Sequence, residues 1–193
     1  MSIAITEDHR ALADTVADFL VKHDARGASR ALLEAPEETN PAWFAEAAEL
    51  GWLGLHVPEA FGGSGYGIEE LVVVVEQLGA GLAPGAFVPT VVASAVLAAA
   101  GTDEVRSRWL PGLADGSVLG AVALGGSAEL RDGTLHGSGG VAIGGGLADV
   151  LLVAVGDDVA VIEATADGVA IESHTRTVIF GGAVSPSFTT SKW

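Results

Sequence analysis

Residues 55–67, LHVPEAFGGSGYG, are the most distinctive segment of the chain. One proline and four closely spaced glycines predict a structured loop here instead of a helix. The apolar segment GWLGL, residues 51–55, leads into the loop, and IEELVVVVEQL, residues 68–78, follows it. The loop is therefore expected to separate two helical stretches.

Two helices are expected before the loop. Thr6 is the predicted N-cap of the first, which ends near Lys22. Asn40 followed by Pro41 indicates the start of the second, because a side-chain cap precedes a proline at the first helical position. Gly51 is the expected stop of this second helix.

The pattern after the loop predicts a third helix over residues 68–78, with apolar residues at helical spacing. Four consecutive valines, residues 72–75, widen the apolar stripe, so burial on more than one side is expected. A strand over the same valines is the alternative, but the length of the pattern and the flanking glutamates favour the helix.

Two more helices are expected before the predicted strands begin. Residues 88–100 carry no charge and predict a buried helix that ends at Gly101. Thr102 is the predicted N-cap of a further short helix, which Pro111 interrupts, and Gly116 closes the segment.

Strand-like segments follow Ser117, separated by turn signals such as Asp132-Gly133 and Asp167-Gly168. The predicted strands are residues 118–124, 149–155, 159–164, 168–173 and 176–180. Helices followed by strands predict an α+β chain, with an all-α domain over residues 1–116 and an incomplete β domain over residues 117–193.

Composition excludes several classes of function. The formal charge of -16, from 9 basic and 25 acidic residues, argues against binding of nucleic acid or anionic lipid, and no basic patch is present. With no cysteine, disulfides, zinc–thiolate sites and cysteine nucleophiles are excluded. The N-terminus lacks signal-peptide features, and the longest uncharged stretch, residues 82–101, is interrupted by prolines, so a cytoplasmic protein without a membrane span is expected.

Side chains that could carry chemistry are sparse. The five histidines have no metal-ligand spacing, so no metal site is predicted, and His9 and His23 are expected at solvated helix ends. The adjacent Glu69 and Glu70 are expected on a solvated face. Residues 62–65 and 137–139 resemble fragments of a serine elbow, but turn chemistry explains both better.

The glycine-rich segment 137–146 lacks the lysine of a phosphate loop and the third glycine of a dinucleotide fingerprint. Glycine-rich strand ends could instead let backbone groups approach a flat cofactor closely. No catalytic residue is assigned from the sequence.

Several motifs in order along the chain resemble the flavin-dependent acyl-CoA dehydrogenases. Residues 51–65 look like the family's GxxGxxxPEExGGxG segment, which is the most specific match. Residues 101–116, with GTDE and WLPGL, look like its GTEEQK…LPxLxxG segment. Residues 132–149 fit its DGxxxLNGxKxWITNGxxAD segment without a gap, and Val178, Phe180, Val184 and Pro186 loosely resemble a later strand pattern.

The resemblance implies a fold and an activity. The expected architecture is an α-helical domain, a partial antiparallel β-barrel-like domain and then a C-terminal four-helix bundle, which is absent from this chain. The family binds FAD between the β domain and the bundle. It desaturates an acyl-CoA thioester, with a carboxylate base removing the α-proton and the flavin accepting the β-hydride. The catalytic base is expected in the absent bundle.

The candidate cofactor-binding residues are those that align with the family's flavin-contacting segments, and several depart from the family pattern. They are Leu124, Gly125, Gly126, Ser127, Val141 and Ile143. Gly125 stands at the family's threonine position, and Ile143 offers no hydroxyl to the flavin N5. The expected contacts are therefore backbone amides of residues 124–127 and apolar contacts from Val141 and Ile143.

Three functions fit these observations. The first is an N-terminal portion of an acyl-CoA dehydrogenase of fatty-acid or sterol β-oxidation, inactive alone. The second is a non-catalytic subunit that partners a homologous dehydrogenase subunit. The third is a plain α+β binding protein, against which the residue 55–67 loop and the order of helices argue.

Overall fold

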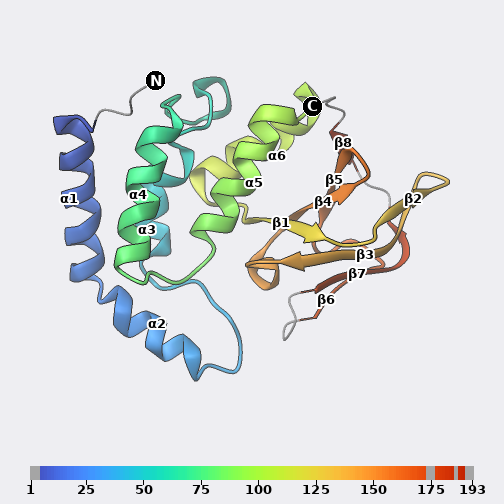
Figure 1. The fold of residues 1–193 in the computed structure, drawn as a ribbon, viewed down its shortest axis with the longest axis horizontal. Helices are drawn as coiled ribbons and strands as arrows, with labels where there is room; N and C mark the ends of the chain where they lie inside the picture. The colour runs from blue at the N-terminus through green and yellow to red at the C-terminus, as the bar shows by residue number, and fades with distance from the viewer. Residues whose placement is uncertain (1–4, 173–176, 185–186, 190–193) are drawn as a thin grey trace.

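The computed structural model describes residues 5–172, 177–184 and 187–189, and Figure 1 shows helices packed beside a strongly curved sheet. The α-helices are α1 (Glu7–Lys22), α2 (Ala25–Leu33), α3 (Phe44–Glu49), α4 (Ile68–Ala80), α5 (Phe87–Ala100) and α6 (Asp103–Asp115). Short 3-10 turns are η1 (Trp52–Gly54), η2 (Glu59–Phe61) and η3 (Gly145–Leu147). The strands are β1 (Gly120–Gly125), β2 (Glu129–Arg131), β3 (Thr134–Ala142), β4 (Val150–Val155), β5 (Asp158–Glu163), β6 (Val169–Glu172), β7 (Thr177–Val184) and β8 (Ser187–Thr189).

The predicted helix ends at Thr6, Gly51 and Thr102 are confirmed. The Thr6 side chain accepts a hydrogen bond from the His9 backbone, and the Thr102 side chain accepts one from the Val105 backbone. Gly51 has φ 75°, a left-handed conformation that ends α3 and is easiest for glycine.

The predicted helix start at Asn40 is wrong. α3 begins only at Phe44, and Asn40 Oδ1 instead accepts the Ala86 backbone N–H at 2.8 Å. Its side chain is therefore used for a tertiary bond to the residue that precedes α5. The expected interruption at Pro111 is also wrong, because α6 continues through this proline to Asp115. α2 was not predicted at all.

α4 is a helix, so the alternative of a strand over the four valines is wrong. Burial is confined to one side: Leu71, Val74 and Leu78 are buried. Ile68 and Val72 are 57% and 55% exposed, against the expectation of burial on more than one side.

The strands form one eight-stranded sheet in the order β6-β7-β3-β1-β4-β5-β8, with β2 paired to β3. β1 and β4 run parallel, and the other described pairs are antiparallel. The α+β class with a partial, curled sheet is thereby confirmed. β1, β4, β5, β6 and β7 match predicted strands, whereas β2, β3 and β8 have no predicted counterpart. The predicted strand residues Ser173 and Arg176, and Pro186 of the motif, lie outside the described residues.

The two halves share a hydrophobic core. One buried cluster combines Leu97 of α5 and Leu110 of α6 with Val150 and Leu152 of β4. Helices α5 and α6 therefore cover one face of the sheet, as Figure 1 also shows. The division into domains at residues 116 and 117 stays a prediction.

Candidate functional site

Three of the predicted cofactor-contacting side chains lie together on one face of the sheet. In the antiparallel pair of β1 and β3, Leu124 stands opposite Val141, and Ile143 follows two residues later. Their side chains are 64%, 53% and 71% exposed, respectively. We call Leu124, Val141 and Ile143 the apolar strip.

Strand alternation explains why the apolar strip is exposed. Ala123 and Ala142, the pair next in register, are fully buried in the core on the opposite face of the sheet. Successive residues of a strand point to opposite faces, so the neighbours of these alanines must point away from that core. A contiguous exposed apolar surface of this kind commonly marks a binding site.

The other three predicted residues lie where β1 ends, at a bend that we call the glycine corner (residues 125–127 with 138–140). Gly125 and Gly140 face each other in register, and both have positive φ, 75° and 84°. A Cβ on Gly126 would lie 2.2 Å from the Ser138 carbonyl oxygen. The two backbone segments are therefore in direct contact, and no side chain fits between them.

Two backbone N–H groups of the glycine corner donate hydrogen bonds within the corner itself. The Ser127 backbone N–H donates to the Ser138 carbonyl at 2.7 Å, and the Gly140 N–H donates to Ser138 Oγ at 3.1 Å. The Ser127 amide, which was expected to face a flavin, is thus already occupied. The exposed Ser127 hydroxyl remains accessible at this corner.

Helix α5 meets the sheet beside the apolar strip. Gly144, directly after Ile143, approaches Pro89 so closely that a Cβ would lie 2.6 Å from the proline ring. On the outer side of α5, Val88 and Val92 are 44% and 45% exposed. These two valines were not among the predicted site residues, although their i, i+4 spacing on a helix that is apolar on all sides was a usable signal.

The side chains of the apolar strip fit the planar ring face of a flavin but provide no polar contact to it. The three apolar side chains can pack against the face of a planar ring system. The strip itself offers no side-chain donor or acceptor, and the Ser127 amide is occupied. The residues present therefore fit a planar, apolar ring face, and polar contacts would have to come from the remaining backbone groups or the Ser127 hydroxyl.

His56, from the residue 55–67 loop, is attached to α5 through Ser94. Ser94 is fully buried, and its Oγ donates to the Val91 carbonyl at 3.1 Å. His56 Nε2 lies 3.0 Å from the same Oγ and must be the donor, because the one hydroxyl proton is used. Burial lowers the pKa of His56 and so favours the neutral ring. A hydrogen bond with the Val91 backbone has a smaller, opposing effect on this pKa.

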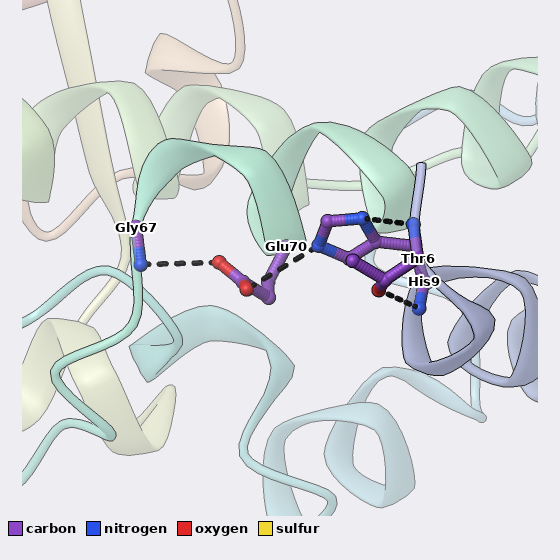
Figure 2. A network of polar contacts seen from close by, with 4 residues as sticks. All are labelled: Thr6, His9, Gly67 and Glu70. Carbon is purple, nitrogen blue, oxygen red and sulfur yellow. Dashed lines mark hydrogen bonds and ion pairs between the residues drawn. The ribbon is translucent and has the colours of Figure 1, made fainter. Parts of the chain in front are cut away.

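His9 and Glu70 form a polar network between the first turns of α1 and α4 (Figure 2). His9 Nδ1 accepts the Thr6 N–H at 3.3 Å, and His9 Nε2 lies 3.4 Å from Glu70 Oε1. Glu70 also accepts the Gly67 N–H at 3.1 Å, and hydrogen bonds from backbone groups and His9 lower the pKa of its carboxyl. The expectation that His9 and Glu70 are merely solvated is therefore wrong.

His23 was likewise expected at a solvated helix end. Its side chain is only 21% exposed, and Nε2 lies 3.1 Å from Glu46 Oε2. Together with the His9–Glu70 contact, this places two histidines in links between helices. Neither histidine belongs to a cluster of metal-ligating side chains. In the described part of the chain, no group of three or more His, Asp or Glu side chains could hold a metal ion.

A cavity of about 580 Å³ lies between the helical half and η3. It is lined by Ser29, Leu32, Leu33, Ala35, Pro36, Glu37, Glu38, Pro84, Gly85 and Gly146. Two glutamates in its wall disfavour phosphate groups. We therefore assign it no role in binding a phosphorylated ligand. Within the described ranges, no helix has both the length and the apolar character needed to cross a bilayer.

Comparison with known proteins agrees with this fold. Residues 6–117 match the family described as "Acyl-CoA dehydrogenase, N-terminal domain". Acyl-CoA dehydrogenase FadE12 of Mycobacterium tuberculosis is 45% identical over 92 residues, which cover 46% of this chain and 23% of that protein. The chain thus spans about a quarter of the length of this relative.

Solved structures extend the likeness over the sheet. The ChsE4–ChsE5 complex from Mycobacterium tuberculosis has a TM-score of 0.80 at 23% identity, covering 98% of this chain and 59% of that one. An acyl-CoA dehydrogenase complexed with FAD from Bacillus anthracis has a TM-score of 0.74 at 24% identity, covering 94% of this chain and 36% of that one. At these identities the structures show a shared fold, whereas the family match covers more than half of the sequence. The chain belongs to the acyl-CoA dehydrogenase family.

Proposed function

We propose that this chain provides the flavin-facing sheet and one helical wall of an acyl-CoA dehydrogenase site. The reaction is α,β-desaturation of an acyl-CoA thioester, and bound FAD would supply the hydride acceptor. The observation that carries the proposal is the apolar strip, an exposed apolar surface at the end of two central strands. The likeness to a family member complexed with FAD supports it.

The residues of this chain would act by packing and by excluding water. Leu124, Val141 and Ile143 would cover one face of the isoalloxazine ring. Val88 and Val92, on the adjacent side of α5, would contact the acyl chain, which is apolar. We assign no catalytic base to this chain, because the resemblance places that carboxylate in the four-helix bundle.

A charge placed on the apolar strip tests the proposal. Leu124→Asp and Val141→Asp should each weaken FAD binding to the purified chain at least tenfold in a flavin fluorescence titration, because a carboxylate would face the ring. Val21→Asp is the matched control, since Val21 is 80% exposed on α1, and it should bind like the wild type. Equal FAD affinity of the strip variants and the control would contradict the proposed surface.

The second candidate is a non-catalytic subunit of a heteromeric acyl-CoA dehydrogenase. The likeness to the ChsE4–ChsE5 complex favours it, as does the absence of a hydroxyl at Gly125 and Ile143. Coexpression with a homologue that contains the four-helix bundle tests it. A copurifying pair that is yellow, when this chain alone is colourless, supports the subunit role; a chain that never copurifies rules it out.

A further inference from the structure

Helix α5 contains two fully buried polar side chains, Thr90 and Ser94, one turn apart. Ser94 binds His56 of the loop, as described above. Thr90 has a different partner: its Oγ1 accepts the backbone N–H of Gly120 at 3.2 Å. Gly120 is the first residue of β1, so this buried bond joins the helical half to the start of the strand that ends in the apolar strip.

The start of β1 is held in place by further contacts. The Leu119 backbone N–H donates to Asp149 Oδ2 at 2.8 Å, and the Leu119 carbonyl accepts the N–H groups of Asp149 and Val150. These bonds tie β1 to β4, whereas the bond from Thr90 fixes β1 against the helix. A Cβ on Gly120 would lie 2.6 Å from the Cβ of Ala93, so helix and strand touch directly here.

The position of Gly120 bears on the apolar strip because β1 is a short central strand. Gly120 and Leu124 lie on the same face, four residues or about 13 Å apart. β3 and β4 pair with β1 on its two sides, so the strand cannot bend freely between these residues. We therefore expect a shift at Gly120 to be passed along β1 to Leu124.

From this geometry we propose that Thr90 is a positioning residue, which sets the location of the apolar strip relative to α5 through its hydrogen bond to Gly120. The expected effect of Thr90 on ligand binding rests on the proposed function. Its structural content, the coupling of Thr90 to the Leu124 end of β1, stands independently of the ligand.

Thr90→Val tests the coupling, because valine has nearly the shape of threonine but leaves the buried Gly120 N–H without an acceptor. Thr90→Ser keeps the hydroxyl and should behave like the wild type. Ser94→Ala is the matched control, since it removes the other buried hydroxyl of the same helix without touching β1.

The first readout is the backbone amide NMR spectrum of the folded 193-residue chain, recorded together with hydrogen exchange at Gly120. Thr90→Val should raise Gly120 exchange at least tenfold and shift the Leu124 and Gly125 amides, whereas Thr90→Ser and Ser94→Ala should not. Unshifted Leu124 and Gly125 amides in Thr90→Val would overturn the inference. So would an equal shift in Ser94→Ala, because a general loosening of α5 would then explain it.

The second readout is FAD affinity, which Thr90→Val should lower about tenfold with recovery in Thr90→Ser. Wild-type affinity in a Thr90→Val chain with shifted strip amides would overturn the role in ligand binding. If the wild type itself binds no FAD, the proposed function fails, and the NMR readout alone decides the positioning role of Thr90. The two failures are thereby distinguishable.

Discussion

The residue 55–67 loop and the glycine corner are both glycine-rich, but their closest backbone contacts differ in burial. In the loop, a Cβ on Gly63 would lie 2.0 Å from the carbonyl oxygen of Val57, which is fully buried. In the corner, a Cβ on Gly126 would lie 2.2 Å from the Ser138 carbonyl, yet Gly126 is exposed. The close backbone contact thus involves the fully buried Val57 in the loop and the exposed Gly126 in the corner.

The two segments also differ in what surrounds them. The loop folds back on η1, with Ser64 N–H donating to Gly54 O and Tyr66 N–H to Leu55 O. The loop contacts the core through Leu55 and Val57. The corner instead lies where β1 ends beside the interior of β3, and the neighbouring Leu124 and Val141 belong to the exposed apolar strip. Glycine content alone therefore does not indicate whether a segment is structural or functional; the burial of its neighbours does.

Of the two glycine variants in close backbone contacts, Gly63→Ala should have the larger effect on stability. The added methyl group meets the buried Val57 backbone, which has no room to move, so a loss of about 3 kcal/mol in the free energy of unfolding is expected. Urea denaturation measures it. Gly79→Ala in α4 is the control: nothing lies within 4 Å of its Cβ position, and a helical glycine replaced by alanine should gain up to about 1 kcal/mol.

Gly126→Ala should cost less, about 1–2 kcal/mol, because the exposed corner can shift to accommodate the methyl group. Ser127→Ala, which leaves the backbone contact unchanged, should remain within about 0.5 kcal/mol of the wild type. The same urea experiment applies. A loss for Gly126→Ala equal to that of Gly63→Ala would break the contrast between the contact at the buried Val57 and the contact at the exposed Gly126.

The loop should also respond to pH through His56. Its folded pKa is lowered from 6.5 by burial, so the unfolded chain binds more protons below about pH 6.5. The free energy of unfolding should therefore be undiminished above this pH and fall as the pH drops from 6.5 toward the folded pKa. His56→Gln, which cannot titrate, should lack this component of the pH dependence.

His136, which is exposed on β3, is the matched control for His56. His136→Gln makes the same change of side chain at an exposed position, and its pH profile is measured beside that of His56→Gln. A wild-type profile that His56→Gln does not flatten would show that the buried imidazole contributes nothing, and the loop would then be held to α5 by packing alone.

Leu124→Ser should have only a small effect on stability, within about 0.5 kcal/mol, because the side chain is 64% exposed. Leu53→Ala, at a fully buried position beneath the loop, should cost about 2–5 kcal/mol. Thermal unfolding of both variants measures the difference. A large loss for Leu124→Ser would mean that the apolar strip is a part of the core and not a free surface.

Local signals in the sequence were sufficient for four of the helices. α1 and α6 begin after threonine caps, α5 is a continuous uncharged segment, and α4 shows helical spacing on its buried side. α2 was missed because its start depends on Asp24, which adopts a left-handed conformation at φ 46° that no local pattern indicates. The Asn40 side chain was misassigned because its actual partner, Ala86, is 46 residues away.

In the sheet, the missed strand β3 carries glycines that disfavour strand formation. It forms because β1 and β7 pair with it from both sides, with register shifts that accommodate the glycine segment. The six candidate cofactor-binding residues were found from motif order, and the structure brings them together. That the Ser127 amide is occupied, and that Val88 and Val92 are partly exposed on α5, could not be inferred from the motifs.

The sequence by itself determined four of the helices in the first half, the loop over residues 55–67, and the family. These features depend on caps, turns and ordered motifs, whose physical causes act over a few residues. The tertiary structure alone decided which apolar residues are buried. Leu124 and Ala123 are adjacent in the chain, yet strand alternation and the position of α5 leave one on the candidate flavin face and place the other in the core.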